Sequence, residues 1–243
     1  MPAGRLWWVA VLAFGLAPAA EGGVVRGTLR PPAVFSRATA ARNPYPGTVH
    51  ALPSADPVVS GQVSDAVISI ERIPSSADSA IAPPAAAPRL AQKNQSFVPH
   101  VLPVAAGTTV EFPNLDPIFH NVFSVSPGKR FDLGKYPRGH SRRVRFDRPG
   151  LIQVYCDIHS NMAAFIVVLP NRAFTQPDGS GRFALPDLPA GEYVVNIWHP
   201  DYPALRRPVR VPASGGLDLD VSLGPASGPR AGVSDSPESA EPR

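Results

Sequence analysis

The residues best suited to chemistry lie in one short segment, 155–162, which reads Tyr-Cys-Asp-Ile-His-Ser-Asn-Met. Cys156, His159 and Met162 are spaced three residues apart and offer a thiolate, an imidazole and a thioether to one metal ion. Cys156 is the only cysteine among the 243 residues. An intramolecular disulfide is therefore excluded, and so is a metal site that needs two thiolates from this chain.

A second imidazole has to come from elsewhere, and His120 is the candidate because it lies in a turn-rich segment between two expected strands. Two imidazoles, a thiolate and a thioether suit both Cu(I) and Cu(II), whereas structural zinc prefers four strong nitrogen or sulfur ligands. Such a donor set leaves no open position for a substrate, so one-electron exchange is expected rather than turnover. The sequence thus predicts a copper site made by His120, Cys156, His159 and Met162.

Short strands have to position these residues. The 31 prolines and 20 glycines make up about a fifth of the chain, which disfavours long helices and predicts an all-β protein. Alternation and turn residues predict strands at 98–104, 108–112, 121–125, 142–146, 151–156 and 163–169. Six strands within 89–170 indicate a sandwich or a barrel. Ile152, Val154 and Cys156 share a parity, so the thiol should point into the core.

The stretch 89–170 resembles the cupredoxins, small blue-copper proteins of the plastocyanin and amicyanin type. The matching residues are Val110-Glu111-Phe112-Pro113-Asn114 with Asp116, His120-Asn121-Val122, Pro149-Gly150, Tyr155-Cys156, His159 and Met162. The resemblance implies a Greek-key β-sandwich that holds one type 1 copper ion. It also implies that His120, Cys156 and His159 are the strong ligands, that Met162 is the weak axial ligand, and that Asn121 ties the two ligand-bearing loops together.

The same resemblance implies a function. In cupredoxins one edge of the imidazole that matches His159 faces solvent within an apolar patch, which Ile158, Met162, Ala163 and Ala164 would rim here. The whole arrangement also resembles exported proteins that are often labelled methylamine-utilisation proteins. We expect a carrier that shuttles single electrons between redox partner proteins. The alternatives are a copper-binding or delivery protein and a non-redox structural β module, while an enzyme ranks last because no further histidine cluster could hold a second copper centre.

Residues 171–223 resemble the carboxypeptidase-regulatory-like (transthyretin-like) β-sandwich, mainly through the run 175–193, TQPDGSGRFALPDLPAGEY. The early segment 24–73 contains two weak matches to the first strands of that family. The cupredoxin would then be inserted into a second sandwich built from both ends of the chain. Alternatively, the early strands belong to the cupredoxin. Since no catalytic zinc motif accompanies this unit, peptidase activity is not implied.

Three segments are expected to lie outside the folded units. Arg5, the apolar run 6–16 and the small residues 17–20 predict a signal peptide at 1–20 and hence a periplasmic protein. A membrane anchor is the alternative, but the run is shorter than the roughly 20 apolar residues of a spanning helix, so no stable membrane insertion is expected after cleavage. Residues 74–88 read as a Pro/Ala-rich linker, and 224–243 as a disordered tail.

The formal net charge is only +4, but basic residues gather between positions 129 and 148. They are Lys129, Arg130, Lys135, Arg138, Arg142, Arg143, Arg145 and Arg148, against two aspartates. Lys129, Arg130, Arg142, Arg143 and Arg145 could form a docking face for an acidic redox partner. An ordinary solvated hairpin is the equal alternative. Nucleic-acid binding is not expected, because the chain is expected to be exported and lacks a repeated pattern of stacking aromatics.

Overall fold

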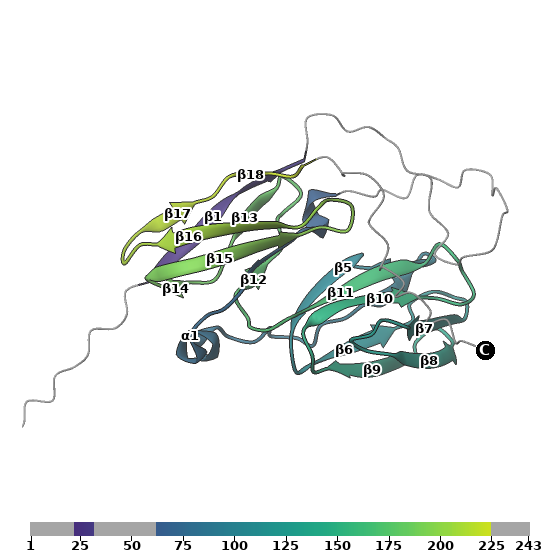
Figure 1. Cartoon of the computed structure of the whole chain (residues 1–243). Coiled ribbons are helices and arrows are strands. Elements are labelled where there is room, and N and C mark those ends of the chain that lie inside the picture. Colours follow the sequence, from purple (N-terminus) through teal and green to yellow (C-terminus); the bar gives the residue numbers. More distant parts are fainter. Residues whose placement is uncertain (1–21, 32–61, 225–243) are drawn as a thin grey trace, which may run out of the picture.

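A computed structural model of the chain describes residues 22–31 and 62–224, and these are nearly all β (Figure 1). The exceptions within the described ranges are one short helix, α1 (Ser75–Ala80), and a 3-10 turn at Val63–Asp65. The expected all-β class is confirmed, and the strands form sheets consistent with a cupredoxin-like β-sandwich. No helix in these ranges is long and apolar enough to cross a membrane. The predicted signal peptide and nearly all of the predicted tail lie outside the described residues.

The first sandwich contains all the predicted metal ligands. Its larger sheet has the order β5 (Val101–Ala105), β11 (Ala163–Leu169), β10 (Gly150–Tyr155), β7 (His120–Ser124) and β8 (Phe131–Tyr136). Two strand pairs accompany it, β6 (Thr108–Pro113) with β9 (Ser141–Phe146), and β3 (Ala91–Lys93) with β4 (Ser96–Val98). Its core holds Ile152, Val154 and Cys156, so the predicted inward side of β10 is confirmed.

The strand expected at 98–104 is two strands, β4 and β5, because Pro99 lacks the backbone N–H that would continue the pairing. Two further strands, β3 and β8, are not among those predicted from the sequence. In β8, Gly134 has a φ of +64° and Asp132 bonds the Gly134 amide, which interrupts the alternation that would mark a strand.

The second sandwich has two sheets with a common core. In one, β1 (Gly22–Arg30) pairs with β13 (Arg182–Ala184), β14 (Leu188–Pro189), β17 (Gly216–Asp218) and β18 (Val221–Ser222). The other has the order β12 (Phe174–Thr175), β2 (Val67–Ile70), β15 (Gly191–Trp198) and β16 (Leu205–Val211). Both early strands, β1 and β2, therefore pair with strands of the C-terminal third and not with the first sandwich.

The segment 74–88, expected to be only a linker, contains α1. Its Asp78 carboxylate accepts a hydrogen bond of 2.7 Å from the Arg172 backbone N–H. The beginning and the end of the first sandwich are thereby tied to each other.

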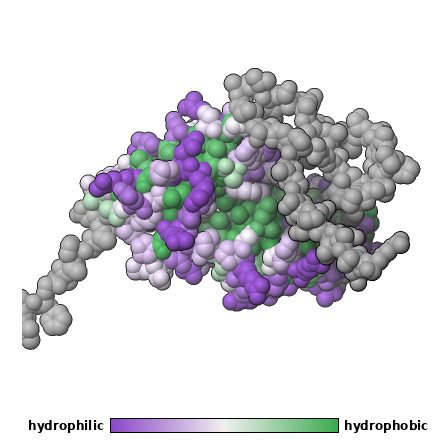
Figure 2. All heavy atoms as spheres, in the orientation of Figure 1, coloured by the Kyte–Doolittle hydropathy of each residue, from purple (hydrophilic) through white to green (hydrophobic). Residues whose placement is uncertain are grey.

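The two sandwiches meet through the outward side of β11. Ala164, Ile166 and Val168 face the core of the first sandwich. Phe165 and Val167, on the other side of β11, pack in a separate cluster with Val101 of β5 and with Val67 and Trp198 of the second sandwich. The Phe165 and Trp198 rings meet edge to face at 5.5 Å, and Figure 2 shows hydrophobic residues gathered between the two units. The outward side of β11 is therefore covered by the second sandwich.

Candidate metal centre

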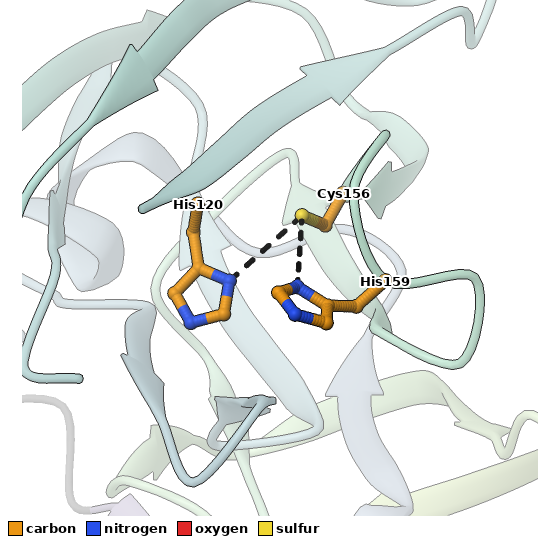
Figure 3. A group of neighbouring side chains, drawn as sticks. All are labelled: His120, Cys156 and His159. Atoms are coloured by element: carbon orange, nitrogen blue, oxygen red, sulfur yellow. Dashed lines mark hydrogen bonds between the residues drawn. The ribbon is translucent and has the colours of Figure 1, made fainter. Parts of the chain in front are cut away.

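His120, Cys156 and His159 converge at one end of the first sandwich (Figure 3). Nδ1 of each imidazole lies 3.9 Å from Cys156 Sγ. The two ring centroids are 4.8 Å apart, and one ligand atom from each residue lies within 4.8 Å of the others. The structure thus brings together three residues that the sequence pattern predicted as metal ligands.

Two neighbouring strands and one tight turn position these side chains. His120 begins β7, and Cys156 directly follows β10, which pairs with β7 through Tyr155 and Phe123. The turn from Cys156 is closed by two backbone bonds, from Met162 N–H to the His159 carbonyl at 3.0 Å and from Cys156 N–H to the Met162 carbonyl at 3.3 Å. His159 is therefore held over the thiol by a compact loop.

The site is largely shielded from water. His120 and Cys156 are buried, and His159 is half-buried. Burial and the neighbouring His120 lower the pKa of His159, with a smaller opposing contribution from Asp116. A lowered pKa favours the neutral imidazole, which is the form that can donate a lone pair to a metal ion.

Asp116 lies at the metal site, although the sequence analysis placed it in a motif without assigning it a role. Its Oδ2 lies 2.7 Å from His120 Nε2, on the side of the ring opposite the thiol. Burial raises the pKa of Asp116, but hydrogen bonds from the Gln95 amide, His120 and the Asn94 amide outweigh it, and the net shift is downward. An ionised carboxylate can only accept in this contact, so the hydrogen bond to Asp116 requires Nε2 of His120 as the donor. Nδ1 is the ring nitrogen that faces the sulfur.

Met162 and Asn121 are both buried beside the cluster. Met162 is 1% exposed and belongs to the same core as Cys156. The Asn121 Oδ1 atom is buried and has no hydrogen-bond partner, so this oxygen does not make the tie between loops that the resemblance implies. The residue after Cys156, Asp157, ion-pairs with Lys135 at 3.7 Å.

The apolar surface beside the site differs from the expected rim. Ile158 is exposed as expected, but Met162 and Ala164 are buried, because the turn bonds hold Met162 inside and the alternation of β11 turns Ala164 inward. Besides Ile158, three exposed apolar residues lie in the loop before His120. They are Leu115, Ile118 and Phe119.

The basic residues do not form one face. Lys129 and Arg130 precede β8 at the end where Phe131 pairs with Ser124, while the pair Tyr136–His120 marks the metal-site end. Arg138 lies in the turn that bonds to Asn114, and Arg142 stacks on the Tyr136 ring at 5.9 Å. Arg143 and Arg145 pair with Glu111 and Asp147. Of the predicted docking set, Arg142 is therefore near the metal-site end. Two basic residues outside that set, Arg138 and Lys135, also lie at this end, and Lys135 is paired with Asp157.

No protein-family model matches the chain, and no curated protein matches it. Part of the chain is similar to solved structures. The Cu-containing nitrite reductase of Thermus scotoductus is 30% identical over 37% of this chain and 24% of its own, with a TM-score of 0.33. A purple cupredoxin from Nitrosopumilus maritimus is 22% identical over 33% of this chain and 98% of its own, with a TM-score of 0.31. Amicyanin from Paracoccus versutus is 19% identical over 42% of this chain and 96% of its own, with a TM-score of 0.33. The matched region spans about a quarter of the reductase.

Proposed function

We propose that the chain is an exported type 1 copper protein that binds one copper ion and carries single electrons between redox partners. The observation that supports this most directly is the convergence of two imidazole Nδ1 atoms on one buried thiol, each at 3.9 Å. His120, Cys156 and His159 would be the strong ligands, and the buried Met162 the axial one. Bound copper would supply the exchange of one electron between Cu(I) and Cu(II).

The residues present fit this ion. The three ligand atoms are two nitrogens and one sulfur, a set that suits copper, and no carboxylate belongs to the cluster. The turn bonds fix His159 and Cys156, and Asp116 fixes His120, so the cage is held before an ion enters. A cage held in this way reorganises little when the charge of the ion changes, which favours electron transfer.

The proposal extends to the setting of the protein. We place the mature chain in the periplasm, without nucleic-acid or stable membrane partners, and take its partners to be redox proteins. The second sandwich would be a carboxypeptidase-regulatory-like module without peptidase activity, which supports one face of the copper-binding sandwich.

A copper titration tests the proposal. We expect the full purified chain without its signal peptide to bind one equivalent of Cu(II) and develop an intense visible band from thiolate-to-copper charge transfer. A chemical reductant should bleach the band, and reoxidation should restore it. A colourless protein that binds only Cu(I) would favour copper delivery instead, and one that binds no copper would favour a structural module.

The charge near the metal-site end leads to a kinetic prediction. Reversing Arg138 and Arg142 together (R138E/R142E) should slow oxidation of the Cu(I) form by hexacyanoferrate(III), an anion, by about tenfold at low ionic strength, because local charge steers encounter. The matched control is K129E/R130E at the opposite end of β8, which should have a much smaller effect. Stopped-flow rates at several salt concentrations measure both, and the difference should shrink as the Debye length falls to about 10 Å at 0.1 M salt. Equal slowing in the two variants would contradict a local docking role.

A further inference from the structure

We propose that Asp116 is a positioning residue that holds His120 with its lone pair on Nδ1 and lowers the reduction potential of the metal centre. This inference rests on the proposed function for the potential, but its effect on the imidazole can be measured without metal. The four predicted ligands, His120, Cys156, His159 and Met162, do not by their spacing require a carboxylate beside His120.

The contact is direct and shielded from solvent. Asp116 Oδ2 lies 2.7 Å from His120 Nε2, and the two side chains are 5% and 0% exposed. Water therefore does not compete for the Nε2 proton. The other ring nitrogen, Nδ1, faces Cys156 Sγ at 3.9 Å.

The carboxylate is itself held by backbone amides of the turn between β3 and β4. The Asn94 amide donates to Oδ1 at 2.5 Å and the Gln95 amide donates to Oδ2 at 2.8 Å. Both residues have a φ of +54°, an uncommon backbone conformation for a glutamine, and this conformation directs the two N–H groups to one acceptor. The turn thus supplies two fixed donors to a buried negative charge.

A second set of bonds fixes the loop from the other side. The Asp116 amide donates to Asn114 Oδ1 at 2.9 Å, and Asn114 Nδ2 donates to the Ile118 and Tyr136 carbonyls at 2.8 and 2.9 Å. Asn114 is fully buried. The backbone of Asp116 is therefore held in place, and turning its carboxylate away from His120 would break the bonds from the Asn94 and Gln95 amides.

Two chemical consequences follow from this arrangement. A carboxylate that accepts the remote N–H of a ligating imidazole fixes its tautomer and makes the imidazole a stronger donor. A buried negative charge close to the ion also stabilises Cu(II) more than Cu(I). Both effects lower the reduction potential. If Asp116 only stabilised the loop, replacing it would lower the stability of the fold and leave the potential unchanged.

The first test uses the metal-free protein. Ring ¹⁵N chemical shifts of His120 in the full chain should show a protonated Nε2 and an unprotonated Nδ1. In the Asp116→Asn variant this preference should weaken, with a second tautomer or exchange broadening. A native His120 protonated at Nδ1 would overturn the inference, and because no copper is present, that result does not depend on the proposed function.

The second test uses the copper-loaded protein. In Asp116→Asn we expect the Cu(II) affinity to fall about tenfold more than the Cu(I) affinity, within the 10–100-fold range typical of lost partners of metal ligands. For one electron this raises the midpoint potential by about 59 mV. The matched control is Glu111→Gln, which removes a negative charge on β6 that pairs with Arg89 and Arg143 rather than with a ligand. If Asp116→Asn loses thermal stability but keeps the native potential, Asp116 only stabilises the loop and the inference is wrong. An equal rise of the potential in Glu111→Gln would also overturn it.

Discussion

In the Cys156→Ser variant, the intense visible band of the copper-loaded protein is expected to disappear completely. The band requires charge transfer from a thiolate, and Cys156 is the only cysteine of the chain. Its sulfur is the atom on which both Nδ1 atoms converge at 3.9 Å. A serine hydroxyl is a hard, weakly acidic ligand and does not replace a soft thiolate for copper. Absorption and EPR spectra after addition of one equivalent of Cu(II) measure the effect.

The same substitution should remove most of the stabilisation that copper gives to the fold. An ion that binds only the native state stabilises it by about 2.7 kcal/mol at a free concentration of 100 times its Kd. We expect copper to raise the thermal midpoint of the native chain and to leave that of Cys156→Ser nearly unchanged. Asp157→Asn is the matched control, because Asp157 is the next residue in the same loop and ion-pairs with Lys135. A band of native intensity in Cys156→Ser, or its loss in Asp157→Asn, would contradict the assignment of the thiolate.

The ligands that share one loop could be predicted because their spacing is local. Cys156 and His159 are held by a turn of a few residues, so their separation in sequence determines their proximity in space. Asp116 could not be given its role in the same way. Its role depends on the turn at Asn94 and Gln95, where two non-glycine residues have a positive φ, and the sequence reading did not predict the hairpin that contains this turn.

The organisation of the fold was predictable only in part, because alternation shows which face of a strand is buried but not what buries it. The strands predicted within 24–29 and 65–73 are present. Their partners lie far away in sequence, as in the parallel pairing of Val25 with Leu217. The basic residues show the same limit. Two ends of a strand of six residues are about 20 Å apart, so Lys129 and Arg142 are close in sequence but belong to different ends of the sandwich.

The pairing of β1 with the C-terminal third leads to the second large prediction, at the turn 178–181. Gly181 has a φ of +85°, and a Cβ there would lie 2.2 Å from the Leu29 carbonyl oxygen of β1. Its own carbonyl accepts the Leu29 N–H at 2.7 Å. Gly181→Ala should therefore cost about 1–2 kcal/mol for the left-handed backbone and further free energy for displacing β1, about 3 kcal/mol or more in total. Thermal and chemical unfolding of the full chain measure this loss.

The other glycine of the same turn, Gly179, provides the control. At Gly179 an added Cβ would meet no atom within 4 Å, so Gly179→Ala should change the free energy of unfolding by less than about 0.5 kcal/mol. The metal cluster lies in the core of the other sandwich, so a Gly181→Ala chain loaded with copper below its unfolding transition should keep the spectrum of the native chain. A destabilised second sandwich beside an unchanged metal centre would show that β1 is needed to complete the second unit and that the first sandwich holds the site by itself. If the two alanine variants were equally stable, the close packing of β1 against this turn would be wrong.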